Sequence, residues 1–523
     1  MSFALALVVA AVSGFIALSY EIVWYRVIAF ESWGLPGAFG LLLAAYLFGI
    51  AIGSRVAGRF CKDDALTGDK RQLRSLALFA LVANVVAWAV VPFFGFTAKT
   101  GGDWPVALGL VIVAAGLLGA ILPLVCHFGI TPDDRAGQRL SYVYLANIVG
   151  SAAGSLLTGF VFFDIWPLQT IGLVIALVGL ALVGSLVILS DLKASARAGW
   201  LSGVAMVAGV LFVATPRAYD RIWERLLYKT DFKPDTKFAE IIETKSGVIT
   251  VTQDGTVYGG GAYDGRFNTS IRWDRNGIMR AYGIGALHPA PKKILMIGLA
   301  SGSWATVIQH LPGLEHLTIV EINPGYNKLI AGHPSVAGVL HDPKVDIVID
   351  DGRRWLNRHP DERFDVIVMN TTWHWRAHIT DLLSVEFMKL ARAHLAPGGF
   401  FYFNTTSSDD VQKTAATVWP YAMRVYNFMA VSDSPLVFDK TRWEKTLATF
   451  SFDGEPAIDR TTEDGQKFFD DLVKYPDSIS APPEREGLES RDSVLARTQL
   501  ATVITDDNMA AEWRQVLRLQ EPP

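Results

Sequence analysis

The sequence predicts a multi-domain protein: an α-helical transmembrane bundle of about seven helices, then a small β-hairpin region and an α/β domain with a doubly wound parallel sheet. Two observations lead to this prediction. Of the 523 residues 51% are hydrophobic, too many for a wholly soluble protein, and the apolar residues concentrate before position 215. Later segments alternate continuous apolar strands with helical stretches. We therefore place the domains at 1–215, 216–285 and 286–523.

The first domain contains seven apolar runs of membrane-spanning length. They cover residues 3–23, 37–56, 75–94, 106–126, 142–163, 168–189 and 200–214, and the last run is the shortest. Gly49 and Gly53 in the second run, like Gly150 and Gly154 in the fifth, place small residues on one helical face. This spacing predicts close helix packing. The chain is therefore expected to be a multi-pass membrane protein with the lipid bilayer as a partner.

Basic residues in the loops between the runs bear on orientation. One set of loops holds only Arg26 and Lys99. The other set holds ten basic residues: Arg55, Arg59, Lys62, Lys70, Arg71, Arg74, Arg135, Arg139, Lys193 and Arg197. The positive-inside rule assigns the richer set to the cytoplasm, which with seven spans places the carboxyl-terminal domain outside. Four basic residues between positions 217 and 229 argue the other way. If the seventh run, residues 200–214, is a re-entrant or interfacial segment, the number of spans becomes six and this domain lies in the cytoplasm.

Charge and cysteine content exclude two classes of function. The net charge is −4, the isoelectric point is about 6.2 and no Lys/Arg-rich run occurs, so nucleic acid is not expected as a partner. The two cysteines, Cys61 and Cys126, lie in or beside predicted spans. The later domains therefore have neither a disulfide framework nor a thiolate nucleophile.

Five continuous apolar runs, KKILMIGLA, HLTIVEI, VDIVIDD, FDVIVMN and GGFFYFNT, predict the parallel sheet, in which ligands bind at the carboxyl ends of the strands. The turn GLASGSWA places Gly298 and Gly302 where the backbone passes close to a ligand. Glu321 ends the second strand, where a carboxylate can hold ribose hydroxyls, and Asp351 follows the third, near an adenine edge. Asn370 ends the fourth strand. This order predicts a nucleoside-type site, or one descended from it.

The turn TTWHWRAH after the fourth strand carries aromatic, basic and titrating side chains. His374 is a candidate acid or base, and Arg376 is a candidate anion-binding group. Trp373 and Trp375 are candidate walls that exclude water or stack on a ligand. His374 and His378 have the i, i+4 spacing of a metal pair, but no third ligand is evident nearby, so no metal site is predicted. Helix capping or packing is the alternative role for one of these histidines.

The segment beyond about residue 431 is less informative. It contains charges and prolines with few strongly periodic runs. We expect a surface excursion or lid before the closing segment LATVITDDNMAAEW.

Taken together, these motifs resemble the spermidine synthases, in particular a bacterial group whose synthase domain is fused to a multi-spanning membrane region. SGFIALSYEIVWYR and YLANIVGSAAGSLLTGF are similar to that membrane region, and YDGRFNTS, GLASGS, VEINP, DDG and ITDDNMAAEW follow the soluble domain in order. The resemblance implies a class I methyltransferase-like fold, a bacterial inner-membrane location and substrate contacts from Tyr263 and Asn268. It also implies that S-adenosylmethionine or a derivative is bound by Gly298, Ser301, Gly302, Glu321 and Asp351.

The chain departs from the family pattern where the chemistry takes place. The aspartate that holds the donor's amine corresponds to Ser301, and the two aspartates that bind and deprotonate the attacking amine correspond to Asn370 and Trp373. The glutamine of the family's D-G-x-x-Q segment corresponds to Asn268. An amide does not titrate, and a polycation needs charge pairing to offset its desolvation. Ordinary spermidine synthesis is therefore not expected.

Three functions remain open, and the favoured one is a cofactor-free acyl transfer or cyclisation on an exported substrate, such as ring closure of an amino-terminal glutamine with loss of ammonia. Glu321 or Asp351 would take the amine's proton, and Asn370 or His374 would stabilise the oxyanion. The second is transfer of an aminopropyl, aminocarboxypropyl or methyl group from an S-adenosylmethionine-type donor to a membrane-associated acceptor in the cytoplasm, with Arg376 on a carboxylate. The third is a non-catalytic scaffold.

Overall fold

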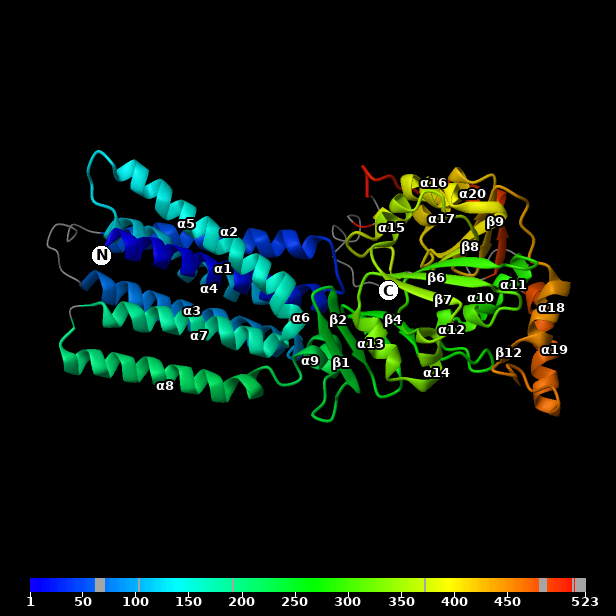
Figure 1. The fold of residues 1–523 in the computed structure, drawn as a ribbon, viewed down its shortest axis with the longest axis horizontal. Coiled ribbons are helices and arrows are strands. Elements are labelled where there is room, and N and C mark those ends of the chain that lie inside the picture. The colour runs from blue at the N-terminus through cyan, green and yellow to red at the C-terminus, as the bar shows by residue number, and fades with distance from the viewer. Residues whose placement is uncertain are drawn as a thin grey trace. The chain divides into compact units, whose positions relative to one another are not determined.

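A computed structural model describes residues 1–61, 71–101, 104–190, 192–370, 373–478, 487–509 and 512 (Figure 1). Lys62 and Lys70 of the basic loop, and parts of the TTWHWRAH and ITDDNMAAEW segments, lie outside these residues. The chain divides into two compact units. The first comprises Met1–Phe238 and Glu243–Gly247, and the second comprises Ala239–Ile242 and Val248–Pro523. The two boundaries between the three domains drawn from the sequence stay predictions.

Among the described residues of the first unit, seven helices are long and apolar enough to cross a membrane. They are α1 (Phe3–Glu31), α2 (Gly37–Ala57) continued by η1 (Gly58–Phe60), α3 (Arg71–Lys99), α4 (Trp104–Gly129), α5 (Ala136–Leu157) continued by η3 (Thr158–Phe162) and α6 (Phe163–Ile165), α7 (Leu168–Ile188) and α8 (Ala194–Ala218). The predicted count is confirmed. The expectation that the last span is the shortest is wrong, because α8 has 25 residues and α7 has 21.

Small residues bring these helices together as the sequence predicts. A Cβ atom on Gly150 of α5 would lie 1.8 Å from the carbonyl oxygen of Ala11 in α1. A Cβ atom on Gly53 of α2 would lie equally close to the carbonyl oxygen of Gly116 in α4. Since no side chain fits at these distances, glycine permits the close approach of the backbones.

The hairpin region begins after a short helix, α9 (Ile222–Tyr228), and a 3₁₀ turn, η4 (Lys229–Asp231). Four strands follow, and they pair in chain order: β1 (Glu240–Thr244), β2 (Gly247–Val251), β3 (Thr256–Gly259) and β4 (Ala262–Arg266). Strands β2 and β3, and β3 and β4, are antiparallel. The expected hairpins are therefore present. Two one-turn helices, α10 (Met279–Tyr282) and α11 (Ile284–Leu287), lead to the main sheet.

The main sheet has eight strands in the order β14-β10-β11-β9-β8-β5-β6-β7. All five predicted strands are present and parallel to one another: β5 (Lys293–Ile297), β6 (His316–Glu321), β7 (Val345–Ile349), β8 (Phe364–Met369) and β9 (Leu395–Asn404). Three antiparallel strands extend it: β10 (Tyr421–Val425), β11 (Phe428–Ser432) and β14 (Leu488–Ser490). This is the strand order of a class I methyltransferase-like fold with one added edge strand.

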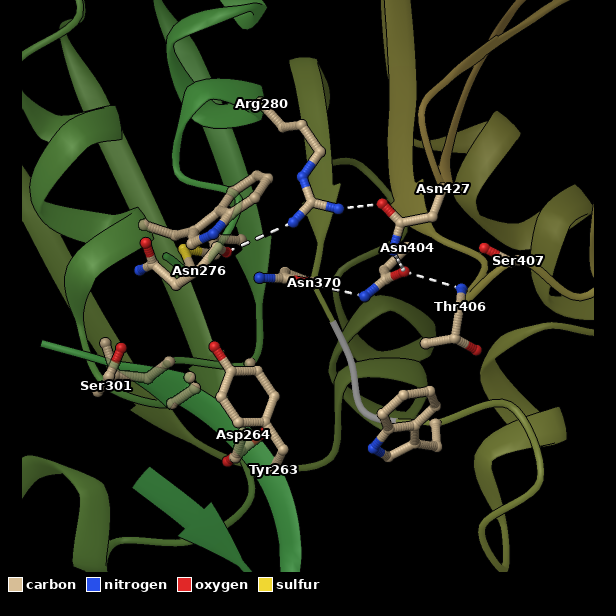
Figure 2. A pocket seen from close by; sticks show the side chains of 17 residues that line it. Tyr263, Asp264, Asn276, Arg280, Ser301, Asn370, Asn404, Thr406, Ser407 and Asn427 are labelled. Atoms are coloured by element: carbon tan, nitrogen blue, oxygen red, sulfur yellow. Dashed lines mark hydrogen bonds between the residues drawn. The ribbon is translucent and has the colours of Figure 1, made fainter. Parts of the chain in front are cut away.

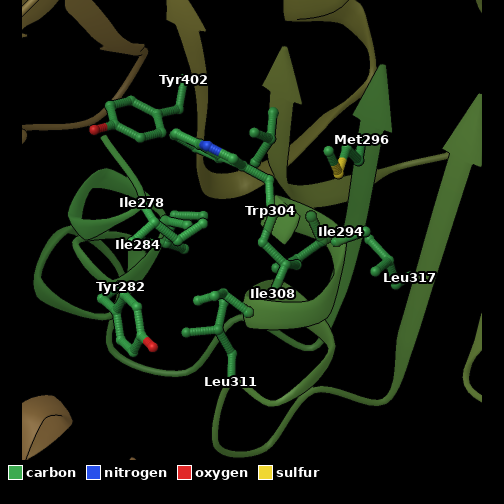
Figure 3. Packing of buried hydrophobic residues seen from close by; sticks show 14 of the residues in the cluster. Ile278, Tyr282, Ile284, Ile294, Met296, Trp304, Ile308, Leu311, Leu317 and Tyr402 are labelled. Atoms are coloured by element: carbon green, nitrogen blue, oxygen red, sulfur yellow. The ribbon is translucent and has the colours of Figure 1, made fainter. Parts of the chain in front are cut away.

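Both faces of the sheet are covered, which explains why its central strands are continuously apolar. Ile294 and Met296 of β5 belong to one buried cluster, whereas Leu295 and Ile297 belong to a cluster on the opposite face. Figure 3 shows Ile294 and Met296 near Trp304 in the first cluster. The covering helices are α12 (Ser303–Gln309), α13 (Gly325–Ala331), α14 (Pro334–Ala337), α15 (Gly352–Arg358), α16 (Val385–Ala393), α17 (Asp409–Val418), α18 (Lys440–Thr449), α19 (Glu463–Ser478) and α20 (Arg491–Arg497).

The described part of the segment beyond residue 431 packs into the core, which differs from the surface excursion or lid that the sequence predicts. Trp443 and Leu447 of α18 and Phe469 of α19 are buried in the first cluster, so these helices belong to the core of the unit. Two short strands, β12 (Ser451–Phe452) and β13 (Glu455–Pro456), connect them as a hairpin. The prediction of a lid was wrong because a few large apolar residues, although widely spaced, are enough to bury these helices against the core.

Strand order also positions the site. The chain passes from β5 to β6 on one side and returns to β8 on the other, so the strand order reverses beside β5. In doubly wound sheets ligands bind at this switch point, outside the carboxyl ends of the strands. Gly298 follows β5 and Asn370 follows β8, which places the two residues at this edge.

Candidate active site

A cavity of about 260 Å³ lies at the switch point (Figure 2). Its wall combines the end of β4, helix α10, the turn after β5 and the residues that follow β8, β9 and β10. Of the predicted site residues it includes Tyr263, Gly298, Ser301, Asn370 and Trp373. It also includes Asp264, Arg280, Asn404 and Asn427, which the sequence did not single out.

The glycine-containing turn after β5 contributes its backbone to the cavity. Gly298 has φ +90°, and an added Cβ would meet nothing within 4 Å, so the turn leaves open space beside it. Gly302, with φ +76°, faces the protein instead, because its Cβ would lie 3.1 Å from Ile330 Cγ2. The Ser301 hydroxyl donates to the carbonyl oxygen of Arg266 at 3.1 Å. Ser301 therefore joins the turn to β4, in addition to lining the cavity.

Glu321 lies behind this turn and outside the cavity wall. Its Oε2 accepts the backbone N–H of Leu299 at 2.7 Å, and its Oε1 accepts that of Asn323 at 2.7 Å. Burial raises the pKa of Glu321 to about 7, although these amides and that of Ala300 favour the ionised form. Each oxygen therefore accepts one backbone amide and keeps a further lone pair, and the ribose contact of Glu321 stays a prediction.

Asp351 also lies outside the cavity wall. Its side chain caps α15 by accepting the backbone N–H of Arg354 at 2.7 Å. An N-terminal cap stabilises a helix by satisfying a backbone donor that has no partner within the helix. The structure thus gives Asp351 a structural task, and its adenine contact stays a prediction.

The described part of the TTWHWRAH turn forms no regular helix between His374 and His378. Trp373 lines the cavity and stacks on the buried Trp375 at a centroid distance of 6.1 Å. His374 hydrogen-bonds Thr406 Oγ1 through Nδ1 at 2.6 Å, and burial lowers the pKa of His374 to about 4. It is therefore neutral at physiological pH and lies outside the cavity wall.

No group of three or more metal-ligating side chains occurs among the residues that the structure describes. The side chain of His378 is exposed and lies 3.9 Å from Asp381. His374 is instead half-buried and contacts a threonine. The i, i+4 histidine pair does not converge on a shared site.

Among the described residues, Asp264 is the carboxylate of the cavity wall, and it was not among the predicted site residues. It accepts a hydrogen bond from the hydroxyl of the buried Tyr326. Burial raises the pKa of Asp264, while Tyr326 and the positive charge of Arg376 act in the opposite direction. Arg376 lies behind the cavity wall, where an added Cβ on Gly260 would be 2.9 Å from its Nη2. A signal for Asp264 was present in the sequence, because YDGRFNTS is the first motif in which the soluble domain resembles the spermidine synthases.

Tyr263 and Asn268, the two predicted substrate contacts from this region, have different surroundings. Tyr263 lines the cavity. The Asn268 side chain lies outside its wall, where Nδ2 donates to the carbonyl oxygen of Trp273 at 3.0 Å and to Asn276 Oδ1 at 3.1 Å. Asn268 thus holds together the loop that leads to α10.

Three amides and a guanidinium form a chain of hydrogen bonds along one side of the cavity (Figure 2). Arg280 donates to Asn427 Oδ1, and Asn427 Nδ2 donates to Asn404 Oδ1 at 3.0 Å. Asn404 Nδ2 then donates to Asn370 Oδ1 at 3.1 Å. These residues come from α10, from the end of β9 and from the segments that follow β8 and β10, so only the folded sheet brings them together.

Comparison with known proteins agrees with this architecture. A family model described as a methyltransferase domain matches residues 275–435. Polyamine aminopropyltransferase 2 of Streptomyces coelicolor is 27% identical over 378 residues, which are 69% of this chain and 66% of that protein. The chain is similar to the polyamine aminopropyltransferases. Polyamine aminopropyltransferase 2 of Ralstonia nicotianae is also 27% identical, over 75% of this chain and 78% of its own length.

The likeness to polyamine aminopropyltransferases reaches into the membrane half, because the matches cover a larger share of the chain than the residues after position 215 make up. The chain spans about two thirds of the Streptomyces protein's length. Among solved structures, spermidine synthase from Thermotoga maritima aligns with 17% identity and a TM-score of 0.34, covering 42% of this chain and 80% of that one. The predicted resemblance to a spermidine-synthase-like transferase fold after a set of apolar helices is confirmed.

Proposed function

We propose that the protein is a membrane-anchored, cofactor-free acyl-transfer enzyme that closes the ring of an amino-terminal glutamine on an exported chain. The observation that carries this proposal is the amide of Asn370. Its Oδ1 accepts from Asn404, which leaves its Nδ2 as a donor that makes no hydrogen bond to any described residue. A donor in a small cavity is suited to stabilise the oxyanion that forms when an acyl group is attacked.

The size of the cavity supports a small acyl substrate. Pockets for drug-sized ligands usually enclose about 300–1,000 Å³. The 260 Å³ found here is below that range and suits a single amino-acid residue better than a sulfonium nucleoside. The carboxylates that the family resemblance assigns to a nucleoside lie outside this cavity wall and have other partners, because Glu321 accepts two backbone amides and Asp351 caps a helix. No step is therefore assigned to S-adenosylmethionine.

The residues of the cavity wall have roles in this reaction. The α-amine nitrogen of the glutamine attacks its own side-chain carbonyl carbon, and Asn370 Nδ2 stabilises the resulting oxyanion. Asp264 takes a proton from the attacking nitrogen, aided by a pKa that burial raises. It returns that proton to the departing amide nitrogen, the carbon–nitrogen bond breaks, and ammonia leaves with the ring closed. Tyr263 and Trp373 enclose the chain end.

The location of the substrate follows from the loop charges. Ten basic residues in one set of loops against two in the other favour a carboxyl-terminal domain outside the cytoplasm of a bacterial inner membrane. An exported peptide is available on that side, whereas S-adenosylmethionine is not. Reporter enzymes fused after residue 523 test the placement. Activity of a cytoplasm-only reporter would contradict the outer location.

The reaction is tested with the purified full-length chain in detergent and a glutamine-first peptide. Ammonia release is expected without added nucleotide. Asn370→Ala should lower kcat by about 10²–10³-fold, the usual effect of removing one oxyanion donor. Asn357→Ala is the matched control, because Asn357 lies on α15 with its amide donating to the carbonyl oxygen of Arg353. Equal rates for the two variants would contradict the role of Asn370.

A second candidate function is transfer of an aminopropyl or related group from an S-adenosylmethionine-type donor to a membrane-associated acceptor in the cytoplasm. The names of the similar proteins and the carboxylate of Asp264 favour it. It requires a nucleoside to reach Glu321, which lies outside the cavity wall. Calorimetric titration with methylthioadenosine distinguishes the two functions, since binding is expected only for group transfer.

A further inference from the structure

The chain of amides beside the cavity has a fixed direction. A guanidinium carries donors and no acceptor, so the bond from Arg280 requires Asn427 to present its oxygen to Arg280 and its nitrogen to Asn404. The backbone N–H of Thr406, which can also only donate, reaches Asn404 Oδ1 at 2.8 Å. Two independent donors therefore hold the oxygen of Asn404 away from Asn370.

The orientation of the Asn404 amide determines the orientation of the Asn370 amide. Because the nitrogen of Asn404 faces Asn370, Asn370 must offer its oxygen in return. Its nitrogen then points away from Asn404, toward the middle of the cavity (Figure 2). The wall at this point is a hydrogen-bond donor, although an isolated asparagine could present either end of its amide.

The charge at the start of the chain strengthens this arrangement. Arg280 lines the cavity and forms no ion pair with any carboxylate in the described part of the protein. Its guanidinium carbon lies 4.7 Å from the centre of the Phe428 ring. Hydrogen bonds in series polarise one another, so a cation at one end makes the last donor more positive.

We propose that Asn404 is a positioning residue that holds the Asn370 amide with its nitrogen toward the cavity, so that this site selects a ligand bearing a carbonyl or carboxylate oxygen over one bearing an ammonium group. This inference deepens the proposed function and rests on it for the identity of the oxygen, the side-chain carbonyl of glutamine. The selectivity itself is a property of binding and does not require catalysis.

The test replaces the donor of Asn404 without changing its shape. In Asn404→Asp the carboxylate accepts from Thr406 and Asn427 but has no proton to give to Asn370. The Asn370 amide is then expected to turn, donate to residue 404 and present its oxygen to the cavity. The measurement is the ratio of two affinities, for N-acetyl-glutaminylglycine, whose blocked amine cannot close the ring, and for putrescine, by calorimetry on the full-length chain in detergent.

The wild type should prefer the dipeptide. Asn404→Asp should lower the ratio by about a hundredfold, since the bound carbonyl loses a donor and meets an oxygen instead, each worth about tenfold. Asn427→Asp is the matched control. It also adds a carboxylate to the cavity wall, but that group pairs with Arg280, and the Thr406 N–H still orients Asn404. Its ratio should stay within about fivefold of the wild type.

An unfolded variant would bind neither ligand, so its ratio of affinities could not be measured. If Asn404→Asp does not fold, Asn404→Leu removes the same donor without charge, and a tenfold lower ratio is expected. An unchanged ratio in the folded variant overturns the proposal, as does a wild type that prefers putrescine. A wild type that prefers this dipeptide yet releases no ammonia from glutaminylglycine leaves this inference standing and overturns the proposed reaction.

Discussion

Replacing Glu321 by glutamine tests whether this carboxylate anchors the turn after β5. Its side chain is 4% exposed, and burial raises its pKa from the ordinary 4.5 to about 7. The folded protein therefore binds a proton on the Glu321 carboxylate more tightly than the unfolded chain does. Between those two pKa values, each pH unit lowers the free energy of unfolding by about 1.4 kcal/mol.

Over the whole interval this group lowers the free energy of unfolding by about 3 kcal/mol as pH rises from 4.5 to 7. Glutamine does not titrate, so Glu321→Gln removes this loss. The free energy of the variant minus that of the wild type should therefore increase by about 3 kcal/mol across the interval. The other titrating groups of the chain cancel in this difference.

The assay is native-state hydrogen exchange of amides in β5 and β6 of the full-length chain, corrected for the intrinsic exchange rate at each pH. Glu315→Gln is the control, because Glu315 lies one residue before β6 and pairs with Lys292 at the surface. It should change the opening free energy by less than about 1 kcal/mol. A difference between Glu321→Gln and wild type that does not vary with pH would refute the reasoning.

Four further variants test neighbouring parts of the site. Asp351→Ala should cost about 0.5–2 kcal/mol of stability through loss of the α15 cap and leave dipeptide binding unchanged in calorimetry; weaker binding would restore its ligand role. Gly302→Ala should lower the melting temperature more than Gly298→Ala. Both positions have a positive φ, but only the new Cβ at position 302 would contact a side chain, that of Ile330. The wild type should lose stability at His374 as pH falls from about 6.5 to 4, because the imidazole binds a proton more tightly in the unfolded chain than in the folded protein. His374→Gln should not show this loss. Identical acid melting curves of the two proteins would contradict this.

The parallel sheet was predictable because a strand buried on both faces must be apolar at every position. KKILMIGLA became β5, with successive residues in opposite clusters. The antiparallel strands β10 and β11 were not predicted, although β11 is wholly buried, because their runs are short. Helix α18 was missed for a related reason, since Trp443 and Leu447 provide much of its buried surface among polar neighbours.

The site was predictable where it depends on strand ends alone. Asn370 was found by its place after β8, and the same logic applied to β9 would have found Asn404 at the end of GGFFYFNT. Arg280 and Asn427 carry no such signal, because they reach the cavity only through the packing of α10 and the β10–β11 turn. Glu321 and Asp351 lie near the expected edge, yet which way a carboxylate faces is decided by backbone amides that a sequence pattern does not reveal.

One measurement tests the central claim most directly: mass spectrometry of the products when the full-length chain receives a glutamine-first peptide, putrescine and decarboxylated S-adenosylmethionine together. A cavity that presents an amide donor should yield the ring-closed peptide and ammonia, with putrescine unchanged. Spermidine in place of the ring-closed peptide would contradict the account.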